Sequence, residues 1–375
     1  MDVITSRSSA GLLKTAYREI SNRLEKLKRA QLRLLLHDRP SAAPRILFLT
    51  PDYNVPSGGI RVIYRHVDIL NDAGISAFVL HQRAGFRCTW FENTTSITNM
   101  GNAQINRSDL LVVPELDVDV LGRLSPGIKY AIFNQNSHLT WKRASSVELS
   151  RYMANDDLSG IVTVSSHNQE MLEYSFPNAA VQRVHLGIDP AIFFAGSGNR
   201  PRSIGYMPRR GREDARQVFE MLQARGCLRG WQVTALDGLS HGAVADRLRS
   251  TRIFLAFTNQ EGFGLPAAEA MACGNYVIGN HGNGGREFFH NDFSCSIDHG
   301  DTLAFAKAVE QAIIADREDD DWCTQRGRAA SEFILSKYTP EQEKTDVLTL
   351  YTKLLRNGGD SKKSAAPIQT EWAST

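Results

Sequence analysis

The stretch EGFGLPAAEAMACGNYVIGNHGNGG, residues 261–285, carries the most informative pattern of this 375-residue sequence. The apolar run at 253–257 precedes it and is expected to be a buried strand. Gly262 and Gly264 allow the backbone angles of a tight loop and the close approach of a ligand. Pro266 suits the first position of a helix. A strand, a glycine loop and a helix N-terminus in this order favour binding of a diphosphate.

Two glutamates lie at the ends of this loop. Glu269 is expected in the first turn of the helix, where its carboxylate can accept two hydrogen bonds from a ribose diol. Glu261, eight residues earlier, lies just past the strand end and can face a sugar hydroxyl. Taken as isolated residues, Glu261 would more often be a solvated loop residue and Glu269 a partner of the helix dipole.

Strands and helices alternate on both sides of this stretch, which is typical of a doubly wound α/β sheet. The expected strands are 45–50, 76–80, 110–113, 130–133, 160–164, 203–207, 231–235, 253–257, 276–279 and 294–297. The expected helices are 60–73, 214–225, 242–249, 266–272, 302–315 and 340–355.

A turn-rich segment, AGSGNRPRS at 195–203, divides the series into two Rossmann-like domains. Ligands bind at the carboxyl ends of strands in such sheets, so the cleft between the domains is the expected site. The predicted divisions are a basic helical extension at 1–40, domains at 41–195 and 203–338, a closing helix at 339–356 and a disordered tail at 357–375.

Composition excludes several classes of protein. The formal net charge of +2 gives no general attraction to nucleic acid. The five cysteines are scattered and include no CxxC pair, so neither a disulfide framework nor a zinc site is expected. The sequence lacks an apolar run of about 18 residues and a signal-peptide pattern. These features favour a cytoplasmic location.

Residues 10–36 are predicted to form a basic amphipathic helix. The segment holds seven Lys or Arg and two Glu, a net charge of +5, and its apolar residues recur at helical spacing. Such a helix can lie on an anionic membrane, which would place the protein at the inner face of the membrane. Pairing with a second copy, in a homodimer, or packing on its own chain fits the same pattern.

The string EGFGLPAAEAMACG resembles the signature of the retaining GT-B glycosyltransferases of glycosyltransferase family 4, with seven residues between its two Glu. The resemblance implies that Glu269 holds the nucleotide ribose and that Glu261 contacts the transferred sugar. It also implies that one run of backbone lies near the sugar and the diphosphate: Gly262, Phe263, Gly264 and Leu265.

The resemblance extends over residues 45–355. It implies a closing helix, around Tyr351, that crosses back to the first domain. The other matching segments are TVSS at 163–166, HLGID at 185–189, SIGYMPRR at 203–210 and GNGGREFF at 282–289.

The sequence departs from the family in its basic pair. The family neutralises the donor diphosphate with Arg and Lys, whereas only arginines stand here. Arginine can bind phosphate through two hydrogen bonds, so the chemistry is retained. Arg209 is the expected match, with Arg212 or Arg210 as its partner, and the alternative is a surface loop rich in arginine.

A second departure lies after the strand at 130–133, where many members have a His. This chain has Gln135 and Asn136, which can hold a sugar or acceptor hydroxyl but cannot act as a base. His138 follows as a structural or acceptor-facing residue. Gly58 and Gly59 follow the first strand and begin a helix. The resemblance implies that this glycine loop lies near the donor phosphates and the acceptor. The alternative is a plain tight turn.

The resemblance implies a reaction in which the leaving diphosphate takes the acceptor proton, while the protein positions the substrates and stabilises charge. No metal or other cofactor is expected, because the arginines and the helix N-terminus supply the positive charge. The DVD string at 117–119 is expected to be incidental, and the acidic run at 318–321 to be a solvated helix end.

The predicted function is transfer of a sugar from a nucleoside diphosphate sugar to a glycan or lipid-linked acceptor in cell-surface polysaccharide biosynthesis. Three alternatives share the fold. They are an inactive sugar-nucleotide-binding subunit, a membrane-tethering scaffold that acts through residues 10–36, and a sugar phosphorylase.

Overall fold

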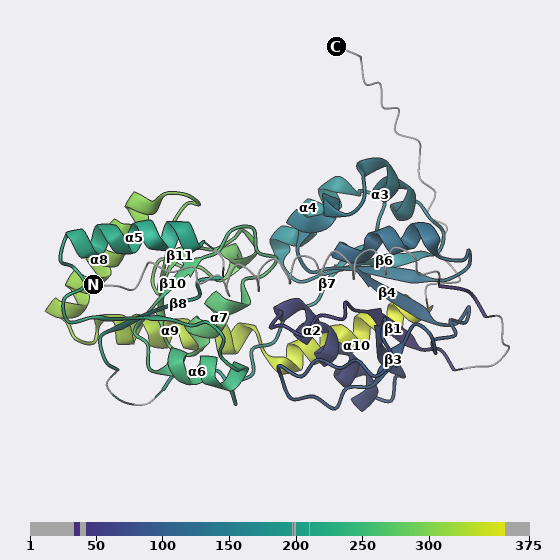
Figure 1. Cartoon of the computed structure of the whole chain (residues 1–375), viewed down its shortest axis with the longest axis horizontal. Helices are drawn as coiled ribbons and strands as arrows, with labels where there is room; N and C mark the ends of the chain where they lie inside the picture. The colour runs from purple at the N-terminus through teal and green to yellow at the C-terminus, as the bar shows by residue number, and fades with distance from the viewer. Residues whose placement is uncertain (1–33, 38–42, 197, 199, 210, 357–375) are drawn as a thin grey trace, which may run out of the picture.

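The computed structural model describes residues 34–37, 43–196, 198, 200–209 and 211–356. This part of the chain forms two parallel sheets, each covered by helices (Figure 1). The strand order is β3-β2-β1-β4-β5-β6-β7 in the first sheet and β12-β11-β10-β8-β9 in the second. The predicted doubly wound α/β class is therefore correct.

The first sheet has buried apolar strands at its centre, as parallel sheets covered on both faces require. Its two edge strands, β3 and β7, have three residues each and were not predicted. The strands are β1 (Ile46–Leu49), β2 (Ala77–His81), β3 (Ile97–Asn99), β4 (Leu110–Pro114), β5 (Tyr130–Asn134), β6 (Leu158–Thr163) and β7 (Val181–Arg183). The helices between them are α2 (Gly58–Asp72), η1 (Glu115–Arg123), η2 (Ser137–Lys142), α3 (Ser146–Met153) and α4 (Ser166–Ser175).

The second sheet follows after residues 184–202. Its strands are β8 (Ser203–Tyr206), β9 (Gln232–Ala235), β10 (Ile253–Phe257), β11 (Tyr276–Asn280) and β12 (Ser294–Ser296). Its helices are α5 (Arg212–Ala224), α6 (His241–Arg249), α7 (Leu265–Ala272), η3 (Gly284–Glu287), α8 (Thr302–Glu318) and α9 (Trp322–Lys337), and α9 was not predicted.

The acidic run between α8 and α9 is exposed at the end of α8, as expected, and one of its residues also forms ion pairs. The carboxylate of Asp320 lies 2.9 Å from Arg252 and 3.2 Å from Arg202. Arg252 is itself buried and also pairs at 2.8 Å with the fully buried Asp316. The run therefore contributes to an ion-pair cluster beneath the second sheet, because two arginines need carboxylate partners there.

The last helix, α10 (Pro340–Arg356), returns to the first sheet and lies beside α2 (Figure 1). The ring of Tyr351 meets that of Phe48 on β1 edge to face, with 5.1 Å between centroids. The side chain of Leu354 reaches Gly160 on β6, where an added Cβ would lie 3.1 Å from it. The chain therefore crosses between the two sheets twice.

Most of the predicted helix at 10–36 lies outside the described residues, as does the tail at 357–375. Its last residues are described and are not helical. Leu34 and Leu36 form parallel bridges with Leu124 and Ile105. These bridges pair their backbone groups, while their apolar side chains pack against the core of the first sheet. Among the described residues, no helix is both long and apolar enough to cross a membrane.

Candidate active site

The loop between β10 and α7 lies where the two halves of the chain meet. Gly264 adopts the left-handed conformation, with φ 96°, and α7 begins at Leu265, one residue before the expected start at Pro266. Glu269 consequently lies in the second turn of α7 and not in the first, which corrects the prediction. Its side chain is buried and directed to the other half of the chain, where it meets Arg61.

Glu269 is held by two basic residues. Nη2 of Arg61, on α2, lies 2.7 Å from Oε1 of Glu269, and Nε2 of His241, at the start of α6, lies 3.6 Å from the same oxygen. Burial by itself raises the pKa of Glu269, but Arg61 and His241 outweigh it and the pKa lies below its ordinary value. The carboxylate is therefore charged at neutral pH and can accept hydrogen bonds.

Glu261 lies between two strained backbone positions. Gln260 and Asn283 are the two non-glycine residues with positive φ in the described part of the chain, at 52° and 66°. Glu261 pairs with Asn283 in a parallel bridge, and its N–H donates to Gly282 at 2.8 Å. The N–H of Gly284 donates to Gly282 at 2.9 Å, which closes a γ-turn at Asn283. Such strain is typical of functional sites.

The loop after β5 packs directly against this segment. Nε2 of Gln135 donates to the carbonyl of Gly59 at 3.1 Å, and Nδ2 of Asn136 donates to the carbonyl of Gln260 at 2.8 Å. A Cβ added to Gly58 would lie 3.0 Å from Leu265. The structure thus brings together Gly58, Gly59, Gln135 and Asn136 with the glutamate loop.

Phe263 has a buried side chain that packs in the core. Its ring lies 5.2 Å from that of Phe288 and 5.1 Å from that of Tyr338, measured between centroids. Only the backbone of Phe263 is therefore available to a ligand.

The predicted arginines occupy different positions. Arg209 is exposed, and its Nη1 donates to the carbonyl of Pro56 at 2.6 Å, in the loop before α2. Arg212 is the first residue of α5 and is also exposed. Arg210 lies outside the described residues. Arg209 is thus the one of the three that the structure places at the junction of the two halves.

His138 lies beside this junction, on η2. Its ring stacks on that of His167, with 5.3 Å between centroids. Burial, and then the proximity of His167, lower the pKa of His138. Oδ1 of Asn136 accepts from the N–H of His138 at 3.1 Å, so Asn136 caps η2 and fixes the loop.

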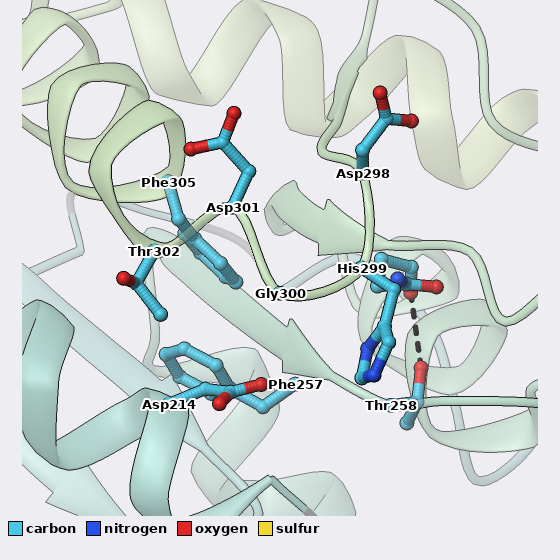
Figure 2. A pocket seen from close by; sticks show the side chains of 10 residues that line it. Asp214, Phe257, Thr258, Asp298, His299, Gly300, Asp301, Thr302 and Phe305 are labelled. Carbon is cyan, nitrogen blue, oxygen red and sulfur yellow. Dashed lines mark hydrogen bonds between the residues drawn. The ribbon is translucent and has the colours of Figure 1, made fainter.

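A small pocket at the carboxyl end of β10 does not have the form of a cation site. Figure 2 shows the carboxylates of Asp298 and Asp301 directed away from Asp214, while His299 is directed toward Thr258. The described residues contain no cluster of three or more metal-ligating side chains. In the DVD string, Asp119 pairs with Arg123 at 3.0 Å on η1.

From the sequence, three residues of this junction received no site role, although Glu287 follows the glycine-rich turn in the matching segment GNGGREFF. Arg61 was missed although it follows the glycine pair in the first turn of α2. Glu115, buried at the end of β4, accepts from the N–H of Gln135 at 3.2 Å, and burial raises its pKa to about 7. Glu287 binds Ser166 at 2.8 Å, Tyr338 at 3.0 Å, and Arg183. Their partners are more than a dozen residues away in sequence, so no local pattern reveals them.

Comparison with known proteins finds a family match for part of the chain. Residues 211–330 match the family described as glycosyl transferases group 1. The chain is 29% identical over 120 residues to N-acetyl-alpha-D-glucosaminyl L-malate synthase of Bacillus anthracis, a match that covers 32% of this chain and 30% of that one. It is 24% identical over 269 residues to an alpha-1,6-glucosyltransferase of Actinobacillus pleuropneumoniae serotype 7, covering 68% and 80% of the two chains.

The fold is similar to that of solved structures. The structure of HepE from Anabaena, in complex with UDP and glucose, superposes with a TM-score of 0.60 at 13% identity, over 82% of this chain and 99% of that one. The part of the chain that matches the group 1 glycosyltransferases is thus residues 211–330, and the chain has the GT-B fold. This confirms the family predicted from the string at 261–274.

Proposed function

We propose that the protein transfers a sugar from a nucleoside diphosphate sugar to a glycan or lipid-linked acceptor, with retention of configuration, in cell-surface polysaccharide biosynthesis. The observation that carries this proposal is the placement of Glu261 and Glu269. Glu261 lies in the loop between β10 and α7, and Glu269 lies in the second turn of α7. That loop faces Gln135 and Asn136 of the other half.

Each residue has a proposed part in donor binding. Glu269, charged and buried, accepts the ribose hydroxyls. Glu261, held by the strained turn at Asn283, contacts the transferred sugar. Arg209 and Arg212, with the N-terminus of α7, stabilise the charge of the departing diphosphate. The relatives support a donor of this class, since one is named a glucosyltransferase and one structure holds UDP and glucose.

The basic segment at 10–36 is proposed to bind an anionic membrane and bring the site to a lipid-linked acceptor at the inner face. Its net charge of +5 supports this assignment. Sedimentation with vesicles of anionic and of neutral lipid tests it, using the full chain and a form that lacks residues 1–36. Equal recovery of both forms in the vesicle pellet contradicts the assignment.

The donor proposal is tested by calorimetric binding of UDP, GDP, dTDP, ADP and CMP in the presence of EDTA. One nucleotide is expected to bind wild type. Glu269→Ala is expected to weaken that binding by about 1–3 kcal/mol, because ribose hydroxyls lose a charged acceptor. Glu332→Ala, which removes an exposed glutamate of α9, is the matched control and should bind normally.

Turnover separates the parts of the two glutamates. Glu261→Ala should lower the transfer rate more than it lowers nucleotide affinity, because its contact is with the sugar. If no nucleotide of the panel binds wild type, the donor proposal fails and the phosphorylase and scaffold alternatives take its place.

A further inference from the structure

One ion pair joins the two halves of the chain at the proposed ribose carboxylate. Arg61 and Glu269 are 208 positions apart in sequence, yet Nη2 and Oε1 lie 2.7 Å apart. The two side chains are 17% and 8% exposed, so the pair is largely shielded from water. In a shielded pair the attraction is screened less than in a surface ion pair, and the geometry is correspondingly well defined.

Arg61 is itself held in place by the helix that carries it. One turn further along α2, Nη2 of Arg65 lies 2.7 Å from Oε1 of Glu343 on α10. The other oxygen of Glu343 accepts from the N–H of Gly187 at 3.1 Å, on the segment that joins the two sheets. The first turns of α2 are therefore fixed to both the returning helix and the connection, and Arg61 has little freedom to follow a moving carboxylate.

The contacts of Glu269 leave it able to bind a diol. Arg61 and His241 both approach Oε1. A carboxylate has lone pairs for about four hydrogen bonds on its two oxygens, so acceptor capacity remains. An arginine that holds one oxygen fixes the rotation of the carboxylate and thereby sets the direction of the remaining lone pairs.

We propose that Arg61 is a positioning residue for nucleotide recognition: it orients the carboxylate of Glu269 for the ribose hydroxyls and makes nucleotide binding depend on contact between the two halves of the chain. This inference rests on the proposed function, because it takes Glu269 as the ribose-binding group. Arg61 does not itself touch the nucleotide in this assignment.

A second ion pair between the halves provides the control. Arg183, at the end of β7, pairs with Glu287 on η3, away from Glu269. Removing Arg183 weakens the contact between the halves but leaves the carboxylate of Glu269 with both of its partners. If Arg61 only holds the two halves together, loss of either arginine should weaken nucleotide binding equally. If Arg61 orients Glu269, its loss should weaken binding more than the loss of Arg183.

The experiment measures the dissociation constant of the nucleotide from the panel above for wild type, Arg61→Ala, Arg61→Lys and Arg183→Ala. Arg61→Ala is expected to raise it about tenfold, a change of about 1.4 kcal/mol. Arg61→Lys should restore part of the loss, and Arg183→Ala should stay within about twofold of wild type. Unchanged or tighter binding by Arg61→Ala, or an equal loss in Arg183→Ala, overturns the inference.

The pH dependence of the dissociation constant distinguishes orientation of Glu269 from simple contact between the two halves. The charged or titratable groups near Glu269 are Arg61 from α2, His241 from α6 and Cys273 at the end of α7 itself. Without Arg61, burial dominates and the pKa of Glu269 rises, so the carboxyl takes up a proton as the pH falls. The ratio of the two dissociation constants, Arg61→Ala over wild type, should grow from pH 8 to pH 5.5.

A constant ratio over that pH range contradicts orientation by Arg61. The two proposals fail in different ways. If wild type binds no nucleotide, or Glu269→Ala binds normally, the proposed function is wrong and this inference falls with it. If Glu269→Ala loses binding while Arg61→Ala does not, the donor site stands and only the part given to Arg61 is wrong.

Discussion

Gly262 faces the carbonyl oxygen of Gln135 so closely that a Cβ on the glycine would lie 1.6 Å from that oxygen. The two residues belong to the two halves of the chain, and their contact is backbone against backbone. No side chain fits between them, so glycine at this position is a condition for the halves to meet. Glu261 and Asn136 flank this contact, so the proposed sugar site depends on it.

Gly262→Ala should therefore abolish closure with little effect on the folding of either half. We expect the transfer rate to fall by about 100-fold, because displacement of reacting groups by an ångström has an effect of this size. The thermal midpoint should remain near that of wild type. Gly242→Ala on α6, where an added Cβ meets no atom within 4 Å, is the control. Retained transfer by Gly262→Ala would show that the reaction proceeds with the halves apart.

Glu115 should make stability depend on pH. Burial raises its pKa from 4.5 to about 7, so between these values the folded chain keeps a proton that the unfolded chain releases. The free energy of unfolding contributed by this group therefore falls as the pH rises through that window. Each pKa unit corresponds to about 1.4 kcal/mol, so the loss is about 3 kcal/mol.

Glu115→Gln cannot ionise and should escape this loss while it still accepts from Gln135. Its stability relative to wild type should rise by about 3 kcal/mol between pH 4.5 and pH 8. Urea unfolding at pH 4.5, 6 and 8 measures the difference. A difference that does not change with pH would place the pKa of Glu115 near its ordinary value.

Asn283 should tolerate glycine and reject valine. Its φ of 66° and ψ of −52° are strained for any residue with a Cβ and worst for a β-branched one. Asn283→Val should lower the free energy of unfolding by about 1–3 kcal/mol. Asn283→Gly should stay within about 1 kcal/mol of wild type, since relief of strain offsets the added entropy of the unfolded chain. Equal stability of the two variants contradicts a strained turn.

The arginine cluster under the second sheet should depend unequally on its two acidic partners. Asp316 is fully buried, and Asp316→Ala should lower the free energy of unfolding by about 3 kcal/mol or more, because Arg252 loses a buried partner. Asp320 has 58% of its side chain exposed, and Asp320→Ala should have an effect of at most about 1 kcal/mol. Thermal unfolding compares the two variants, and the reverse order would contradict this arrangement.

Local pattern predicted the parts of the fold whose signal is contained in a few adjacent residues. The strand at 253–257 has the predicted bounds, because a short apolar run beside a glycine loop is a strong signal. The helix α9 was missed because its buried residues, although at helical spacing, are mostly small or polar: Cys323, Gly327, Ala330, Ser331 and Ile334. The strands β3 and β7 were missed because three residues show no period, and pairing with a neighbour defines them.

The residues of the candidate site also fall into those that a local pattern predicts and those that depend on long-range contacts. Glu261 and Glu269 were proposed from one continuous string, and the resemblance covers both. Arg61 was not proposed, because an arginine near the start of an amphipathic helix is ordinary until its partner, 208 residues away, is known. The closeness of Gly262 to Gln135 also depends on the packing of one half against the other.

The return of α10 has a consequence for the order in which the protein is made. Phe48, on the first strand, finishes its packing only against Tyr351, from a helix synthesised some 300 residues later. While the ribosome translates the second sheet, the first one keeps an uncovered apolar surface where α10 will dock, and surfaces of this kind promote aggregation. The second sheet has one core cluster of its own, and α10 is not needed to cover that face. The first sheet is thus synthesised first but completed last. We expect chaperones to act mainly on this half during translation.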